Sequence, residues 1–219
     1  VKRRPIIYIE TREKKSALIT KKVSKSDFEM SKHGADVLAV LNDLGIDSYD
    51  VDWFSSSLGA TLLIESYQSG VLKGHSSVLL APNPDFEFPL WARIVMNLPI
   101  PRFIHPALMR FTIWLVDRRT KEEGQRIRYR RTLLSQDLNR MLLSARANMR
   151  YRLPDDLSRI DVPCAVMTAS SDTLHDMSKV LSIVERIPEA VLIEVPSNQY
   201  AHEADVLVEI EQFHSSIGN

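Results

Sequence analysis

Cysteine is almost absent from this chain, since Cys164 is the only one among 219 residues. A single thiol excludes an internal disulfide framework and favours a reducing compartment such as the cytoplasm. Cys164 lies within the apolar run 163–169, so we expect a buried and unreactive thiol rather than a nucleophile.

Long hydrophobic runs, an excess of one charge and metal-ligand spacings are missing as well. No apolar stretch approaches the roughly 18–20 residues needed to span a bilayer, and no secretory hydrophobic region opens the chain. Basic and acidic residues number 28 each, which gives no reason to expect a nucleic-acid partner. Without a His-x-x-x-His spacing or paired cysteines we expect no metal and no cofactor. We interpret four histidines as structural and expect them to lack partners. They are His33, His75, His105 and His214.

Short runs rich in Val, Ile and Leu alternate with helical patterns along much of the chain. Their nearly continuous apolarity is typical of parallel strands buried on both faces. After the first run, Ser26 and Glu29 form a capping-box pattern that starts a helix, and Gly45 ends it. The alternation predicts an α/β fold with a mostly parallel open sheet and flanking helices. The predicted strands are residues 5–10, 49–54, 77–82, 163–168 and 190–195.

The alternation breaks in the proline- and aromatic-rich segment 83–160, whose later part, 121–152, is arginine-rich and helical in pattern. We interpret this segment as a helical cap insertion. It separates the N-terminal part of the core, 1–82, from the C-terminal part, 161–219. Its arginines could attract an anionic substrate, but a solvated face paired with nearby acids is the simpler interpretation. They are Arg118, Arg119, Arg126, Arg128, Arg130 and Arg131.

The stretch Ser55-Ser56-Ser57-Leu58-Gly59 joins the second predicted strand to a helical pattern. A sharp strand-to-helix turn with small residues on both sides of a serine is typical of a nucleophile elbow. Ser55 and Gly59 provide the small residues around Ser57. The simpler interpretation is a helix start capped by serine hydroxyls. Asp50 and Asp52 in the same strand have no evident role, because an unpaired acid is costly in a buried strand.

An acid and a histidine follow two later strands. Asp172 comes after the fourth predicted strand, and His202 comes after the fifth, just before the last helical pattern. Serine, acid and histidine in this order, at the ends of successive strands, resemble the α/β-hydrolase superfamily over nearly the whole chain. Asp85, after the third strand, is a second candidate for the acid. His175 and Asp176 lie where a helix begins, so we expect them to be solvated capping residues.

The resemblance implies a serine hydrolase that cleaves a carboxylic ester or thioester through an acyl-enzyme on Ser57. His202 would take the serine proton, Asp172 would orient the imidazole, and the Leu58 N–H would donate to the oxyanion. The partner would be a small-molecule ester or acyl substrate. The best candidates to line its pocket are Phe86, Phe88 and Trp91. An acyltransferase could use the same groups. The alternative from another class is a catalytically inactive binding protein that retains the pocket.

The family's sheet has eight strands, so three would precede the predicted strand 5–10, which resembles the fourth. Residues 10–16 resemble the loop that follows that fourth strand, with its two glycines replaced. The family's third strand separates the fourth from the elbow strand, and its loop carries a second oxyanion donor, typically in a His-Gly motif; we find no counterpart of that strand and loop before the elbow, since the His33-Gly34 pair lies in the helical pattern. A segment preceding this sequence, a strand from another chain such as a homo-oligomer partner, or a displaced first strand could fill the gap. The absent initiator methionine favours the first, and we expect residues 1–219 alone to be poorly soluble or inactive.

Overall fold

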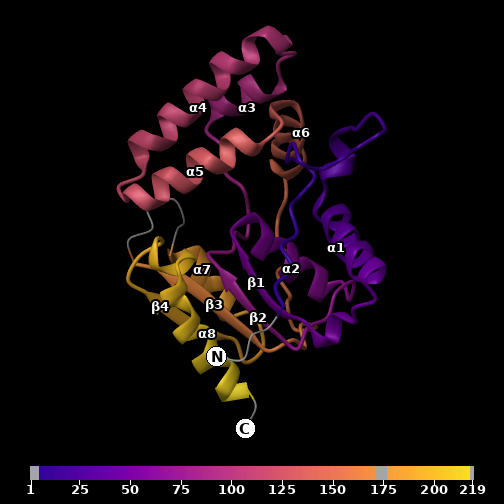
Figure 1. Ribbon diagram of the computed structural model, residues 1–219, viewed down its shortest axis with the longest axis vertical. Coiled ribbons are helices and arrows are strands. Elements are labelled where there is room, and N and C mark those ends of the chain that lie inside the picture. Colours follow the sequence, from indigo (N-terminus) through magenta and orange to yellow (C-terminus); the bar gives the residue numbers. More distant parts are fainter. Residues whose placement is uncertain (1–4, 171–176, 218–219) are drawn as a thin grey trace.

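A computed structural model describes residues 5–170 and 177–217, and within them four strands form one parallel sheet. Figure 1 shows this sheet in the lower part of the molecule. The strands lie side by side in chain order, so their carboxyl ends share one rim: Ser56 pairs with Leu80, and Ala169 with Val195. The strands are β1 (Asp52–Ser56), β2 (Ser76–Leu80), β3 (Cys164–Ala169) and β4 (Val191–Val195).

Helices flank and cover the sheet. The α-helices are α1 (Met30–Leu44), α2 (Leu58–Gln68), α3 (Leu90–Asn97), α4 (His105–Arg119), α5 (Glu123–Ser135), α6 (Leu138–Asn148), α7 (Met177–Val184) and α8 (Leu207–Ile217). Short 3₁₀ helices are η1 (Lys25–Phe28), η2 (Ser48–Asp50), η3 (Arg102–Ile104), η4 (Tyr200–His202) and η5 (Ala204–Val206). Within residues 5–170 and 177–217, every helix is too short or too polar to cross a membrane.

The alternation of side chains along the strands divides the core into two layers. Leu79 and Val166 face one layer, which α1, α2 and α7 cover, with Ile64 and Ile183 among its fully buried members. Val78, Ala165 and Met167 face the other layer, which is covered by α8 through Phe213. Strands buried on both faces explain why β2 and β3 consist mainly of apolar and small residues, and why the parallel α/β arrangement was predictable.

Four of the five predicted strands are confirmed, and the first is wrong. Residues 5–10 form neither a helix nor a ladder with any described strand, and Ile6 and Tyr8 are 92% and 80% exposed. A strand needs a neighbour to satisfy its backbone groups, and apolar composition alone does not provide one. The elbow strand also lies later than expected, so that Asp50 falls in η2, ahead of β1.

The helix after the N-terminal loop begins differently from the prediction. The capping box is formed by Ser24 and Asp27 at η1, where the Asp27 carboxylate accepts from the Ser24 N–H at 2.8 Å, rather than by Ser26 and Glu29. Helix α1 then starts at Met30. Gly45 is confirmed as the helix end, because it adopts a φ of 67°, a left-handed conformation that glycine tolerates.

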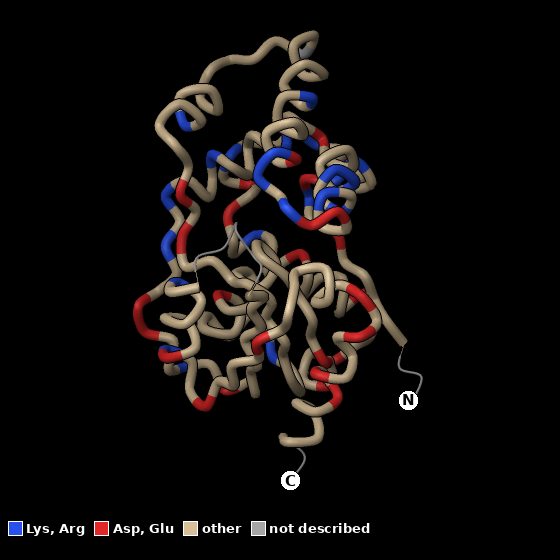
Figure 2. The backbone as a smooth tube through the Cα atoms, turned by 90° about the vertical axis from the view of Figure 1, so that its left-hand side faces the viewer, with Lys and Arg blue, Asp and Glu red and all other residues tan. Residues whose placement is uncertain are grey.

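Helices α3 to α6 lie between β2 and β3 in sequence and at the top of the molecule in Figure 1. The arginine-rich stretch forms two helices, because α5 ends at Ser135 and Asp137 caps α6 by accepting from the Arg140 N–H at 3.0 Å. A small core of Met96, Leu138 and Leu142 joins α3 to α6. Segment 83–160 holds 15 basic and 8 acidic residues, and Figure 2 shows the basic positions gathered in this upper half.

Candidate active site

Ser57 occupies the turn between β1 and α2 with a strained backbone. Its φ of 51° and ψ of −117° lie in a region that residues with a side chain rarely adopt. The Ser57 N–H donates to the Leu80 carbonyl at 2.8 Å, which fixes the turn to the end of β2. Holding such a conformation costs about 1–3 kcal/mol and commonly marks a functional position. The strand–turn–helix geometry expected for a nucleophile elbow is therefore present.

The two small residues around Ser57 are in close contact, as the motif requires. A Cβ added to Gly59 would lie 2.3 Å from the Ser55 Oγ and 3.7 Å from its Cβ. Leu58 is the first residue of α2, where backbone N–H groups have no acceptor within the helix. Its N–H is thus placed beside the serine in the position predicted for an oxyanion donor.

Asn83 is a site residue that sequence reasoning missed. Its side-chain amide donates to the Ser57 Oγ at 3.3 Å. Thr61 holds it there, because the Thr61 hydroxyl accepts from the Asn83 N–H at 2.8 Å and donates to its carbonyl at 3.0 Å. Nearby Ala81 has a φ of 46°, so a second strained residue lies on the same rim. The one available signal was the position of Asn83 directly after a strand end.

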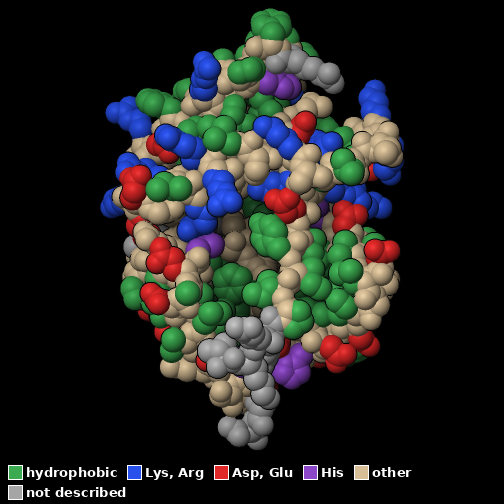
Figure 3. Space-filling model, viewed as in Figure 1, with side chains coloured by type: hydrophobic (Ala, Val, Ile, Leu, Met, Phe, Trp, Pro, Cys, Tyr) green, Lys and Arg blue, Asp and Glu red, His purple; other side chains and the backbone are tan. Residues whose placement is uncertain are grey.

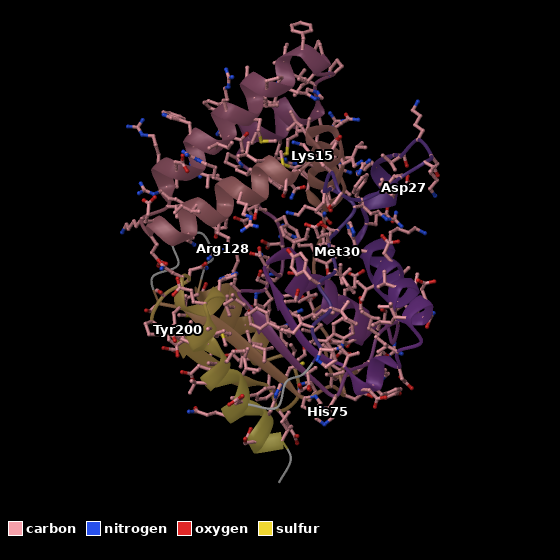
Figure 4. The ribbon with its side chains drawn as sticks, in the orientation of Figure 1. Lys15, Asp27, Met30, His75, Arg128 and Tyr200 are labelled. Carbon is pink, nitrogen blue, oxygen red and sulfur yellow. The ribbon has the colours of Figure 1, made fainter. Side chains whose placement is uncertain are left out.

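His202 lies on η4, after the carboxyl end of β4 and on the same rim as Ser57. Its Nδ1 is 2.9 Å from the Asn198 carbonyl of its own loop. The Asn198 side chain is buried and accepts from the Arg128 guanidinium of α5, and the Gln199 N–H donates to Glu122 at 2.9 Å. Figure 4 shows Arg128 above the loop that carries Tyr200. The helical segment between β2 and β3 thus holds the histidine loop, which sequence reasoning also missed.

The two candidate acids have different surroundings. Asp172 lies outside the described residues, as do His175 and Asp176; β3 ends at the rim with Ala169, three positions earlier in the sequence. The Asp85 carboxylate pairs with the Lys179 ammonium at 2.7 Å and with the Arg152 guanidinium. A carboxylate held between two cations is already neutralised, which makes it a poor partner for an imidazolium.

The three aromatics expected to line a pocket lie in different environments. Phe86 packs on the main core beside Tyr151, with ring centroids 5.9 Å apart. Phe88 packs in the small core of the insertion. Trp91 is 48% exposed on α3 and meets Phe111 edge-on at 6.5 Å. Figure 3 shows a hollow with hydrophobic side chains in its floor, between the insertion above and the sheet below.

Asp52 acquires a structural role at the opposite end of the sheet from Ser57. It accepts from the buried Ser76 hydroxyl at 2.6 Å and lies 2.9 Å from the His75 Nδ1. The Ser76 hydroxyl is also 2.9 Å from the His214 Nε2 of α8. These contacts correct the expectation that His75 and His214 lack partners, and they explain how an acid is tolerated in β1. Ser76 itself is fully buried, so its hydroxyl is closed to substrate.

The other predicted absences concern metals and reactive thiols. No group of three or more His, Cys, Asp or Glu side chains suited to a metal ion occurs among the described residues. Cys164 is buried in β3, as expected, and burial raises the pKa of its thiol to about 12. Ser57 remains the nucleophile candidate with the most specific geometry.

Comparisons with known proteins identify the fold. No family model matches the sequence, and no curated protein matches it. A hydrolase from Pseudomonas aeruginosa is similar with a TM-score of 0.69 and 18% identity, over 92% of this chain and 76% of that one. A thermophilic esterase from Thermogutta terrifontis has a TM-score of 0.72 and 14% identity, over 95% and 78%. An enol-lactonase from Burkholderia xenovorans has a TM-score of 0.67 and 15% identity, over 86% and 74%. The chain therefore has the α/β-hydrolase fold.

Proposed function

We propose that this protein is a serine hydrolase that cleaves a carboxylic ester or thioester through an acyl-enzyme on Ser57. The observation that carries the proposal is the strained Ser57 backbone, held between the end of β1 and the start of α2. Similarity in fold to a hydrolase, an esterase and a lactonase supports the same chemical class. The proposal includes a reducing compartment such as the cytoplasm, in line with the single cysteine.

The chemistry follows from three groups on the rim. A serine hydroxyl becomes an effective nucleophile when an imidazole can accept its proton. If His202 donates its Nδ1 hydrogen to the Asn198 carbonyl, its Nε2 is left unprotonated and can act as the base. As Ser57 attacks, the carbonyl oxygen of the ester becomes an oxyanion that the Leu58 N–H stabilises. Asn83 would orient the serine hydroxyl, and substrate would enter above the rim, with Phe86, Phe88 and Trp91 as proposed lining residues.

Asp172 is the acid in this proposal. It follows β3, the strand next to the one that precedes His202, and its role is to stabilise the imidazolium formed when His202 takes the proton. The competing Asp85 is already paired with Arg152 and Lys179. This pairing is the reason for preferring Asp172.

A fluorophosphonate probe tests the nucleophile directly, because it forms a covalent bond only with an activated serine. We expect labelling of the wild-type protein and its loss in Ser57→Ala. Ser56→Ala, one residue earlier at the end of β1, is the matched control and should retain labelling. Labelling that persists in Ser57→Ala, or its absence from a folded wild-type protein, would contradict the proposal.

Amide substitutions test the acid. Asp172→Asn should reduce the rate of ester hydrolysis by about 10⁴, the loss measured when the triad acid of a serine protease is replaced in this way. Asp85→Asn should reduce it much less, because it leaves the imidazole partner in place. The measurement is kcat on a chromogenic short-chain ester, with circular dichroism to check folding. A larger loss in Asp85→Asn than in Asp172→Asn would transfer the role to Asp85.

The alternative from another class is an inactive binding protein that retains the pocket. In that case the fluorophosphonate would not react, and acyl compounds would bind without turnover. Acyl transfer uses the same groups as hydrolysis and is distinguished by adding an alcohol acceptor, which would then yield a new ester.

A further inference from the structure

A groove on the cap insertion combines positive charge with an apolar wall. It has a volume of about 640 Å³, within the range of about 300–1,000 Å³ that is usual for ligand sites. Three elements enclose it: α3, α6 and the short helix η1. Its lining residues are Lys25, Leu90, Arg93, Ile94, Asn97, Leu98, Arg146, Met149 and Arg150. None of these residues belongs to the rim around Ser57.

The wall of the groove is a stripe along α3. Leu90 and Ile94 lie four residues apart on this helix, and Leu98 follows its end; the three are 72%, 55% and 51% exposed. Met96 of α3 packs into the small core of the insertion instead. Met149, directly after α6, completes the apolar surface. Contact with a hydrocarbon chain would remove this surface from water at a gain of about 25 cal/mol per Å².

The charges of the groove are all of one sign. Four of its lining residues are cationic and none is acidic. Among the described residues, Lys25, Arg93 and Arg150 make no ion pair. The nearby Asp27 of η1 instead accepts from the Ser24 N–H and hydroxyl. Such a set of like charges attracts an anion, which would relieve their mutual repulsion.

Arg146 gives the groove a fixed floor. Its guanidinium donates to the carbonyls of Met96 and Leu98, the latter at 3.2 Å, where α3 ends. These two bonds hold the cation between the apolar stripe and α6, and they leave other N–H donors of the guanidinium for a ligand. An anion bound there would have its hydrocarbon tail directed along α3.

We propose that this groove binds an anionic amphiphile, namely a single acyl or alkyl chain with a carboxylate or phosphate head. The head would lie among Arg93, Arg146 and Arg150, and the chain along Leu90, Ile94 and Leu98. The site is independent of Ser57 and of the proposed hydrolase activity. It is a site for a monomeric amphiphile, since the charges and the apolar wall meet within one groove.

Calorimetric titration of the purified chain with decanoate, below its micelle concentration, tests the proposal. We expect saturable binding that weakens as ionic strength rises from 0.05 to 0.5 M, because salt screens the exposed charges. Inorganic phosphate tests the head alone, and decyl maltoside tests the chain alone. Each should bind at least tenfold more weakly than decanoate. Equal binding of either one would overturn the proposal.

Charge reversal assigns the site. Arg93→Glu with Arg150→Glu should weaken decanoate binding at least tenfold, the typical value for losing one charged hydrogen bond. Arg131→Glu, an equally exposed arginine of α5 away from the groove, is the matched control and should leave binding unchanged. Ile94→Gln should weaken decanoate binding but not phosphate binding. Because these side chains are exposed, circular dichroism should show unchanged folding in all of these variants.

Three results would overturn the proposal. The first is unchanged decanoate affinity in the double variant. The second is an equal loss in Arg131→Glu, which would indicate attraction to net charge rather than to a site. The third is binding to vesicles of phosphatidylglycerol without binding of monomeric decanoate, which would assign this face to a membrane surface instead. Fluorophosphonate labelling of Ser57 is measured separately, so failure here leaves the hydrolase proposal intact.

Discussion

At the residue scale, the rim concentrates backbone strain beside small side chains. Ser57 and Ala81 both have positive φ values, of 51° and 46°, and they end neighbouring strands. The Ser57 N–H and the Ala81 N–H each donate to a carbonyl of the adjacent strand, at 2.8 Å. Parallel pairing thus stabilises two conformations that isolated residues would avoid, and it projects the serine side chain away from the sheet.

Gly59→Ala tests the close approach behind the elbow. The new methyl group would lie 2.3 Å from the Ser55 Oγ, so the hydroxyl must rotate away. We expect a loss of about 1–2 kcal/mol in the free energy of unfolding. In a Ser55→Ala background the methyl finds room, and Gly59→Ala should become neutral or stabilising by up to about 1 kcal/mol. Urea unfolding of the wild type, the two single variants and the double variant measures the coupling between positions 55 and 59. Strictly additive changes in the free energy of unfolding would contradict this coupling.

Burial of His33 predicts a loss of stability in acid. The side chain is 2% exposed, and burial lowers its pKa below 6.5, opposed by Glu13 at 3.5 Å. The unfolded chain therefore binds a proton near pH 6.5 that the folded chain still excludes. The neutral, buried His33 therefore stabilises the folded protein above pH 6.5, and this stabilisation is lost as the pH falls from 6.5 towards the pKa of His33 in the folded protein. The free energy of unfolding falls by no more than about 1.4 kcal/mol per pH unit in that range.

Urea unfolding at pH 8.0, 6.5 and 5.5 measures this slope. We expect His33→Asn to be less stable than the wild type at pH 8.0 but to lose less stability on acidification. His105→Asn, at the start of α4, is the matched control. An equal flattening of the slope in His105→Asn would show that His33 is not the cause.

The residue-scale features that could be predicted from sequence are local ones. The Ser57 turn depends on neighbours within two positions, and the helix end at Gly45 depends on one backbone conformation. Asn83 and Arg128 could not be predicted, because their partners lie 26 and 70 positions away. Only the packing of strand ends and of the insertion brings those groups together.

At the element scale, a loop rather than a strand connects the chain's beginning to the insertion. The Lys15 N–H donates to the Ser135 carbonyl at 2.9 Å, and the Asp137 N–H to that of Glu13 at 2.8 Å. The predicted strand 5–10 failed because composition does not reveal whether a neighbouring strand is present. The inner strands β2 and β3 were predictable because they are buried on both faces, whereas β1 and β4 are partly exposed and were found from their short apolar runs.

Arg140→Ala tests the attachment of this loop to α6. One nitrogen of the Arg140 guanidinium lies 2.8 Å from the Ala17 carbonyl, 3.0 Å from that of Lys14 and 3.4 Å from that of Arg12. Hydrogen bonds from a charged donor contribute about 1.5–3 kcal/mol. For a chain of this size we expect a fall of about 3–12 °C in the melting temperature.

Calorimetry measures this change, with Arg131→Ala as the matched control. Arg131 is exposed on α5, so its removal should change stability by less than about 0.5 kcal/mol. Arg140→Lys should lose only part of the effect, because the lysine ammonium also offers three N–H donors from one nitrogen, but on a side chain of different length and shape. A melting temperature unchanged in Arg140→Ala would show that the loop is held by its backbone bonds alone.

At the scale of the whole molecule, the charge and the core are divided between two halves. The sheet and its flanking helices contain the two large buried clusters, whereas the insertion has a core of only three buried residues. The insertion also carries an excess of basic residues, balanced by acidic residues elsewhere in a chain with no net charge. We therefore expect the sheet to be the last part of the molecule to open.

Cys164 reports on that opening. It lies in β3, an inner strand, and is 1% exposed with a thiol pKa raised to about 12 by burial. At pH 8 this pKa lowers the thiolate fraction by more than about 10³ relative to a free cysteine. We expect Ellman's reagent to leave Cys164 unmodified in the native protein. A thiol introduced by Ser158→Cys, at an exposed loop position, is the internal control and should react at once.

The dependence on urea distinguishes global from local opening. If Cys164 reacts only when the sheet unfolds, its rate should rise with urea in step with the unfolding equilibrium measured by circular dichroism. A rate of Cys164 modification that does not depend on urea would mean that β3 separates locally from β2, without unfolding of the whole sheet. Reaction of Cys164 as fast as the position 158 thiol, in native buffer, would contradict a closed sheet. In that case the rim that positions Ser57 and His202 would lack a rigid support.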